Sequence, residues 1–431
     1  MDSSTHAARR ATRLAVVGAW LMAALLLAFA PAAAQGTGSA PDTVVTDSTL
    51  GTRQPVLLPG VVVSVTREPQ RLNATAATVG VVSGAELSAA KPTHPSEVMG
   101  RVPGVRVNVT SGEGHMTSIR MPMTTDPVYL YLQDGVPIRS TGFFNHNALY
   151  EVNVPQAARI EVLKGPASAL YGSDAIGGVV NVETRAPTAA PTASLYGEGG
   201  AFGYGRLLLS ASDTWGGDGV MTEANLTRTD GWRDATGYDR QSGTIRWDHA
   251  FPGGATLETV LTGSRIHQQT AGSSALLRDD YLDDPELNYT PISRRDVRAV
   301  RLSAAFEKQT VTTLFSVTPY ARWNEMDVLP NWSLTYDPTI YTTGNASAGL
   351  LARVRHDFDE VRTRVIAGLD LDYSPGGHRE NRITPVRSGR VFTDYDTGAL
   401  IYDYDVTFHE ISPYLQVETS PTERLHLNAG L

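Results

Sequence analysis

The 431-residue sequence contains no cysteine. This absence excludes disulfide bonds, thiolate catalysis and metal sites ligated by cysteine. Positive charge is also in short supply, because 36 Lys and Arg residues stand against 45 Asp and Glu residues and give a net charge of -9. Surfaces that bind nucleic acid need clustered Lys and Arg, so the acidic balance argues against nucleic acid as a partner.

Recognisable catalytic motifs are missing as well. The sequence has no HExxH zinc motif, no GxSxG nucleophile elbow and no Walker A loop. Its histidines lack the spacing of metal ligands, and the glycines between residues 172 and 178 lack the GxGxxG order of a dinucleotide-binding loop. We therefore expect a protein that is not an enzyme and that needs no cofactor or resident metal.

A long apolar run occurs only near the N-terminus. Arginines precede an uncharged run over residues 14–30, and Ala32-Ala33-Ala34 follow it before Gln35. This order predicts a secretory signal peptide over residues 1–34, and the small residues at the expected cleavage point disfavour the alternative of a membrane helix. Residues 35–60, rich in Thr, Ser, Gly, Pro and Asp, are predicted to be a flexible periplasmic leader.

The second half of the chain, from residue 192 to residue 431, alternates apolar and polar side chains in long segments. One predicted face carries Val365, Leu369, Phe315, Trp323, Leu302 and Leu415, and the other carries Arg301, Arg322, Asp370 and Gln416. A soluble β-sandwich would also alternate. Long strands, charges opposite the apolar face, and short turns alternating with long loops favour a transmembrane β-barrel instead.

The most informative stretch runs from Ile160 to Arg185, where two apolar runs flank a segment rich in glycine. Two earlier blocks accompany it, SEVMGRVPGV at residues 96–105 and VYLYLQDGVP at residues 128–137. The motif residues in and around these blocks are Arg120, Asp134, Gly135, Lys164, Gly165, Pro166, Tyr171, Gly172, Gly177 and Gly178. A glycine-hinged β-unit would explain any one glycine, but not the ordered set.

In order and spacing, the three blocks resemble the plug domain of TonB-dependent outer-membrane receptors. The resemblance implies an α+β plug domain over residues 61–187, followed by an all-β antiparallel transmembrane barrel over residues 192–431. We expect this barrel to be incomplete, with about 11 of about 22 strands, because the last segment stops within a strand. Where the family usually has Gly and Arg, this chain has Met121 and Lys164, and we expect Lys164 to pair with carboxylates of the barrel.

Local patterns predict individual elements. We expect a short helix over residues 97–102, a strand from Val105, a strand beginning at Ser118, and a strand over residues 128–132 that the Asp134-Gly135 turn closes. Short periplasmic turns are predicted at residues 215–217, 251–254 and 421–423. Long extracellular loops are predicted at residues 269–293, 325–343 and 374–405.

The resemblance also implies sites. A β-prone segment at the start of the plug is the TonB-box candidate, comprising Val61, Val62, Val63, Ser64 and Val65. The first plug strand is the alternative interpretation of this segment, and residues 42–46 are a second box candidate. An apical plug loop supplies the substrate-contact candidates Arg139, Phe143, Phe144 and His146, whose aromatic rings could instead pack inside the plug. The acidic residues 279–286 could bind Ca²⁺ or form a solvated loop.

The implied function is active uptake of a metal chelate, with a ferric siderophore as the first choice, in the outer membrane of a Gram-negative-type bacterium. The implied partners are the TonB-ExbB-ExbD complex, outer-membrane lipid and a small-molecule chelate. Cobalamin, haem or another scarce nutrient is an alternative ligand. A non-transporting surface receptor or adhesin is an alternative function, whereas a passive porin is disfavoured because a plug would block its lumen.

Overall fold

A computed structural model describes residues 62–63, 67, 70–72, 77–124, 128–140, 148–270, 275–422 and 425–431. These residues all lie in one compact unit, Pro59–Leu431. The predicted signal peptide, the leader and the second box candidate at residues 42–46 lie outside the described residues. Among the described residues, no helix combines the length and the apolar character needed to cross a membrane.

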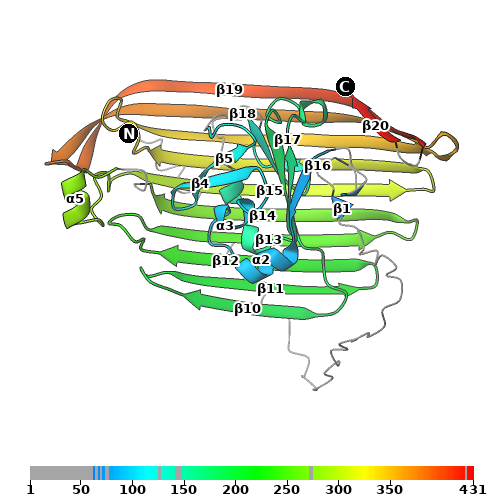
Figure 1. The fold of residues 1–431 in the computed structure, drawn as a ribbon, viewed down its shortest axis with the longest axis horizontal. Coiled ribbons are helices and arrows are strands. Elements are labelled where there is room, and N and C mark those ends of the chain that lie inside the picture. The colour runs from blue at the N-terminus through cyan, green and yellow to red at the C-terminus, as the bar shows by residue number, and fades with distance from the viewer. Residues whose placement is uncertain are drawn as a thin grey trace, which may run out of the picture. The chain divides into compact units, whose positions relative to one another are not determined.

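Eleven strands form one antiparallel sheet in which each strand pairs with the next along the chain (Figure 1). They are β10 (Thr192–Gly199), β11 (Gly205–Trp215), β12 (Asp218–Thr229), β13 (Tyr238–Ala250), β14 (Ala255–Gln269), β15 (Arg294–Gln309), β16 (Thr313–Leu329), β17 (Thr339–Phe358), β18 (Thr363–Ser388), β19 (Val391–Thr422) and β20 (Leu425–Gly430). In the described part of the chain β10 and β20 each pair on one side only. The predicted strand number and the predicted open barrel sheet are confirmed.

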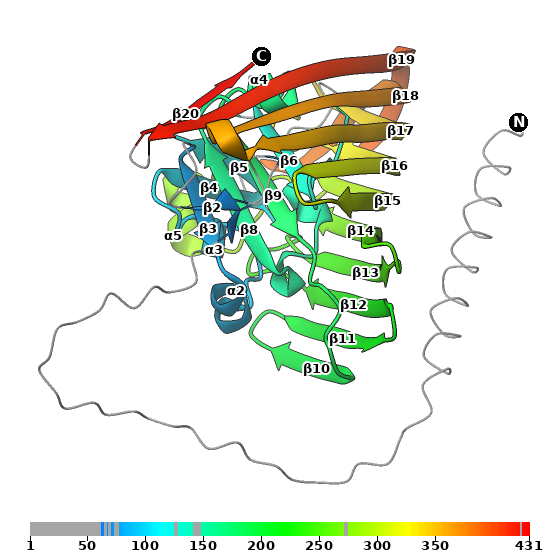
Figure 2. The ribbon, with the colours of Figure 1, turned by 90° about the vertical axis from the view of Figure 1, so that its right-hand side faces the viewer.

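The two faces of this sheet are the predicted ones. Trp323 is 40% exposed on the outer face, whereas Arg322 beside it is 4% exposed. The other outer-face residues are exposed or, in the case of Val365, half-buried, and Arg301, Asp370 and Gln416 are buried on the face that carries the plug domain (Figure 2). Alternation of this kind follows from a strand whose successive side chains meet lipid and lumen in turn.

The connections between strands agree with the prediction only in part. The turns at residues 215–217 and 251–254 and the connection between β14 and β15 are confirmed, and the last of these contains α5 (Arg278–Asp283). The predicted loop at residues 325–343 is wrong, because β16 and β17 leave only residues 330–338 between them. The predicted loop at residues 374–405 is also wrong, since it lies within β18 and β19. In this region β18 and β19 pair with each other, and their Tyr, Thr and Val residues favour strands. The backbone hydrogen bonds of a strand pair form whether or not apolar and polar side chains alternate, so the missing alternation did not indicate a loop.

The plug domain is built on a five-stranded sheet in the order β3-β8-β9-β6-β7. These strands are β3 (Val79–Val82), β8 (Arg159–Lys164), β9 (Gly178–Glu183), β6 (Tyr129–Gln133) and β7 (Val136–Pro137). The plug also contains the strand pairs β1 (Val62–Val63) with β2 (Gln70–Arg71) and β4 (Val105–Ser111) with β5 (Gly114–Ile119), and the helical segments α2 (Gly84–Ala90), α3 (Ser96–Met99), η1 (Leu149–Glu151), η2 (Val154–Gln156) and α4 (Ser168–Tyr171). Its core is apolar and includes Ile160, Val162 and Val180, all fully buried.

Two local predictions for the plug need correction. The helix predicted at residues 97–102 is α3, which ends earlier, at Met99. The strand predicted to begin at Ser118 instead ends there, because β5 closes at Ile119 and pairs back onto β4. Arg120 has φ 55°, a left-handed conformation that interrupts an extended strand.

Close packing explains one motif glycine directly. A Cβ atom on Gly177 would lie 2.5 Å from the Tyr129 ring and 2.9 Å from the Met121 sulfur. We expect Gly177→Ala to lower the free energy of unfolding of the plug by about 1–3 kcal/mol, as overpacking does. Hydrogen exchange of β9 in the purified protein measures the loss. Gly197→Ala is the control, because its Cβ would meet no atom within 4 Å. Equal exchange in the two variants would contradict the packing explanation.

Candidate functional site

The Asp-Gly turn predicted from the sequence joins two motif blocks of the plug. Asp134 and Gly135 have φ values of 52° and 76°, the positive values that a tight hairpin turn requires. Asp134 accepts hydrogen bonds from the backbone N–H of Thr184 at 2.7 Å and from its hydroxyl at 2.6 Å, and the Gly135 N–H donates to Asn181 Oδ1 at 3.0 Å. Burial raises the pKa of Asp134, and these donors oppose that rise. The turn therefore locks β6 to the end of β9.

Lys164 does not contact the sheet as expected. Its Nζ donates to the Pro103 carbonyl at 3.1 Å, so it ties β8 to the residues after α3 within the plug. Partial burial, and then the nearby Arg120, lower the pKa of Lys164. The prediction of a carboxylate partner in the barrel is therefore corrected, and the links between plug and sheet come from other residues.

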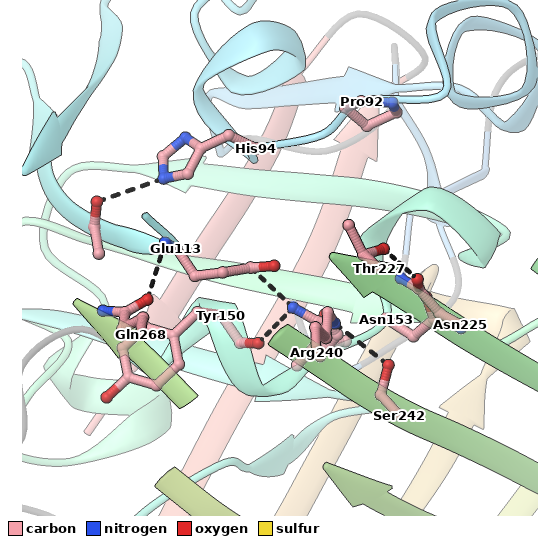
Figure 3. Close-up of polar contacts among 12 residues, drawn as sticks. Pro92, His94, Glu113, Tyr150, Asn153, Asn225, Thr227, Arg240, Ser242 and Gln268 are labelled. Carbon is pink, nitrogen blue, oxygen red and sulfur yellow. Dashed lines mark hydrogen bonds and ion pairs between the residues drawn. The ribbon is translucent and has the colours of Figure 1, made fainter. Parts of the chain in front are cut away.

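Arginines of the sheet reach into the plug, and Arg240 of β13 makes the largest set of these contacts (Figure 3). Its Nη1 donates to Glu113 Oε2 at 2.7 Å and to the Tyr150 carbonyl at 2.8 Å, and its Nη2 donates to the Val152 carbonyl at 2.8 Å. The Glu113 N–H donates to Gln268 Oε1 of β14 at 2.9 Å. Burial raises the pKa of Glu113, and Arg240 opposes the rise. Arg240 thus fastens the tip of the β4–β5 hairpin and the η1 segment to the sheet.

A buried triad of one carboxylate and two arginines makes a second link. Glu151 has a fully buried side chain, and its Oε2 accepts from Arg301 Nη1 of β15 at 3.0 Å. Its Oε1 accepts from Arg139 Nε at 2.7 Å. Arg301 Nη2 also donates to Gln133 Oε1 at 2.8 Å. The triad holds η1 against both the plug sheet and the large sheet.

Contacts from side chains of the sheet to uncharged acceptors of the plug add to the interface. Arg206 Nη1 donates to the Pro92 carbonyl at 2.8 Å, Arg322 Nη1 donates to the Pro137 carbonyl at 2.8 Å, and Asn345 donates to the Ser140 hydroxyl at 2.8 Å. Arginine has five N–H donors in a fixed fork, which lets one side chain serve several carbonyl oxygens. The plug is therefore held to the sheet largely by polar contacts, which water can replace when the two separate.

Arg67 forms a third link, two residues after the TonB-box candidate. Its guanidinium donates to both oxygens of Asp370 in β18, with Nη1 to Oδ1 at 3.2 Å. It lies 4.3 Å from the ring centroid of Tyr171 and 4.6 Å from that of Tyr414, while Arg353 donates to the Arg67 carbonyl. Burial alone would lower the pKa of Arg67, but Asp370 and the two tyrosines raise it overall. The motif residue Tyr171 thus helps to anchor the start of the plug.

The predicted contact residues are placed differently from the expectation. Arg139, expected at an exposed apex, is 6% exposed and is held by Glu151 and Tyr150, which corrects that expectation. Phe143, Phe144 and His146 lie outside the described residues. Of the TonB-box candidate, only Val62 and Val63 are described, and they pair with Arg71 and Gln70 as β1 with β2.

The acidic segment is partly engaged in contacts of its own. Asp280 in α5 accepts from the Tyr289 hydroxyl and pairs with Arg390 at 3.2 Å. In the described parts of the chain, no group of three or more His, Asp and Glu side chains could hold a metal ion.

Sequence reasoning missed Arg67, Glu113, Glu151 and Arg240. The arginines of the sheet could have been found from the alternation pattern, because Arg240 and Arg301 occupy plug-facing positions of strands whose opposite face is apolar. Polar residues at those positions indicate contacts with a polar interior. Their partners in the plug have no comparable local pattern.

Comparison with known proteins gives a consistent result. Residues 71–179 match the family model described as TonB-dependent Receptor Plug Domain. A curated relative, the vitamin B12 transporter BtuB of Vibrio vulnificus (strain CMCP6), is 32% identical over 182 residues, which are 42% of this chain and 28% of the relative. The chain therefore matches well under half the length of that relative.

Solved structures share the fold. The ferric citrate transporter FecA in its unliganded form superposes with a TM-score of 0.66 at 18% identity, over 84% of this chain and 63% of that structure. The pyoverdine receptor FpvA of Pseudomonas aeruginosa PAO1 bound to pyoverdine gives a TM-score of 0.68 at 16% identity, over 90% of this chain and 61% of that structure. At these identities the likeness establishes the fold and leaves the ligand open.

Proposed function

Since the chain belongs to the TonB-dependent receptor family, we propose that it is part of a receptor for active uptake of a metal chelate across the outer membrane, with a ferric siderophore as the first candidate. Energy would come from the TonB-ExbB-ExbD complex acting on residues 61–65. The family consists of transporters and receptors, and we propose no catalytic role. A non-transporting surface receptor or adhesin is the functional alternative.

The proposed organisation follows the predicted boundaries. Residues 1–34 serve as a signal peptide, residues 35–60 as a periplasmic leader, residues 61–187 as the plug and residues 192–431 as barrel strands. Motif residues Gly165, Pro166, Gly172 and Gly178 shape the turns on either side of α4. Three of them, the glycines, have positive φ values of 104°, 76° and 155°.

The observation that carries the proposal is the anchoring of Arg67. The guanidinium is buried between two tyrosine rings and paired with Asp370 of the sheet, and it follows the TonB-box candidate almost directly. Force applied by TonB to residues 61–65 would therefore act on the Arg67 contacts first, because Arg67 is nearer to these residues in the sequence than any other described link between plug and sheet. Beyond Arg67, polar contacts such as those of Arg240 would yield to water more readily than an apolar interface.

Cobalamin is a second candidate ligand, and one observation favours it. The curated relative at 32% identity is named as a vitamin B12 transporter, whereas the ferric citrate transporter FecA and the pyoverdine receptor FpvA match this chain at 18% and 16% identity. The observation applies to less than half of the chain. The ligand class therefore has to be decided by experiment.

Growth rescue by a panel of ligands tests the proposal. A strain that lacks its own receptors and expresses the natural gene is supplied with ferric siderophores, haem or cobalamin as the sole source of iron or of the vitamin. We expect growth on one class only, and only while TonB is present. Growth on none of them, with the receptor present at the cell surface, would contradict the proposed uptake.

The apical loop gives a more specific prediction. We expect alanine at Phe143, Phe144 or His146 to weaken ligand binding, on the order of 1–3 kcal/mol at the strongest position, as truncated contact residues do. Arg139→Ala should act differently, because it leaves the buried Glu151 with one fewer cation and lowers plug stability. Equilibrium binding to the purified receptor measures the loss of affinity, and hydrogen exchange of the plug measures the loss of stability. Unchanged affinity in the three loop variants would move the site to the barrel loops.

A further inference from the structure

The outer face of the central strands β14, β15 and β16 changes from apolar to charged side chains along its length. Leu261 pairs with Leu302, and both are exposed, at 41% and 45%. The next outward-facing row contains Val300 and its partner Trp323, exposed at 46% and 40%. An apolar band that ends on tryptophan is typical of the boundary between hydrocarbon and headgroups.

The row directly beyond this band places two arginines opposite each other. Arg265 of β14 pairs in register with Arg298 of β15, and Glu325 of β16 is the next residue across. Arg265 and Arg298 are exposed on the outer face, and Glu325 is half-buried there. Like charges directly opposite each other on one face destabilise a sheet unless an anion lies between them.

The carboxylates nearby compensate this pair only partly. Glu325 pairs with Arg298 at 3.3 Å, and no ion pair of Arg265 occurs among the residues that the structure describes. One row farther from the apolar band, Asp296 is held by His267, and Asp327 accepts from the Thr342 hydroxyl. The row next to the band therefore keeps an excess of positive charge.

We propose that Arg265 and Arg298 bind the phosphate of a lipid headgroup in the outer leaflet, with the acyl chains of that lipid lying over Leu261, Leu302, Val300 and Trp323. The outer leaflet is assigned from the end of the sheet at which the two arginines lie. Arg265 and Arg298 lie near the β14–β15 connection that contains α5, the end of the sheet with the long connections. Guanidinium groups bind phosphate oxygens through paired N–H donors, and each arginine near an anionic lipid surface strengthens binding about fivefold.

Lipid binding to the receptor purified from its natural gene tests this proposal. The test variant is R265Q/R298Q, and the control is R228Q/R379Q, which removes two exposed arginines elsewhere on the strands. The probes are diphosphorylated lipid A, the same lipid without phosphates, and inorganic phosphate, each titrated into detergent-solubilised receptor and followed by native mass spectrometry. Retention of the heat-resistant folded form on electrophoresis confirms that each variant is folded.

We expect the test variant to bind diphosphorylated lipid A at least tenfold more weakly than the wild type, while the control variant stays within about twofold. The lipid without phosphates should bind the wild type as weakly as diphosphorylated lipid A binds the test variant. Equal affinity of the test and control variants for diphosphorylated lipid A would overturn the proposal. So would equal binding of the phosphorylated and dephosphorylated lipids to the wild type, or competition by inorganic phosphate alone at similar concentration.

Discussion

Val63→Pro should reduce ligand uptake to background while changing ligand affinity by no more than about twofold. Strand addition between receptor and TonB depends on backbone hydrogen bonds, and proline removes an N–H donor and fixes φ. In the described residues β1 pairs with β2 along one edge, and we expect the other edge to accept a strand of TonB. The proposed ligand-contact residues Phe143, Phe144 and His146 are far from Val63 in the sequence, and ligand affinity is measured separately from uptake in the same cells.

Val63→Thr is the matched control, because threonine keeps both the N–H and the β-branched side chain. Proline at Val62 adds information, since successive N–H groups of a strand point to opposite edges. Proline at Val63 should disturb pairing with TonB, and proline at Val62 should disturb pairing with β2. Normal uptake by both proline variants would show that residues 61–65 are not the coupling segment, and residues 42–46 would then be the one remaining candidate.

Glu151→Gln should destabilise the plug by roughly 3–5 kcal/mol, the cost of breaking a buried ion pair on one side. The carboxylate is fully buried between Arg139 and Arg301. Glutamine has nearly the same shape, but it leaves two buried guanidinium groups without a counter-charge. Hydrogen exchange of β8 and η1 in the purified receptor measures the change in opening free energy.

Two controls separate charge from other effects. Glu86→Gln removes an exposed carboxylate from the same domain, and it should change stability by less than about 0.5 kcal/mol, because glutamine also completes the capping box with Ser83. Adding Arg139→Met to Glu151→Gln removes one of the uncompensated cations and should recover part of the lost stability. A destabilisation no larger than that of Glu86→Gln would contradict the role given to the triad.

Structural features that depend on only a few neighbouring residues could be predicted from the sequence. The exposure of Trp323 and the burial of Arg322 follow from a period of two, which a sheet between lipid and lumen imposes on every strand. The Asp134-Gly135 turn follows from a dipeptide whose residues accept positive φ. These signals lie within a few residues and need no knowledge of the tertiary structure.

Contacts between distant segments could not be predicted in the same way. Arg67 and Asp370 are 303 positions apart, and nothing in the sequence near Arg67 indicates its partner. Arg139 was expected at the surface because the family resemblance implies an apical plug loop there, but its guanidinium is held by Glu151 and Tyr150 in the interface. The length of β18 and β19 was missed because their outer parts pair without an apolar face.

Accumulation of radiolabelled ligand in cells that express the natural gene tests the central claim most directly. Ferric siderophores and cobalamin are supplied to matched strains with and without TonB, and the proton-motive force is collapsed in a parallel sample. An energy-driven receptor should concentrate one ligand class inside the cell only when both TonB and the proton-motive force are present. Equal entry without TonB would indicate a passive pore, and ligand bound at the surface with none entering would indicate a receptor that does not transport.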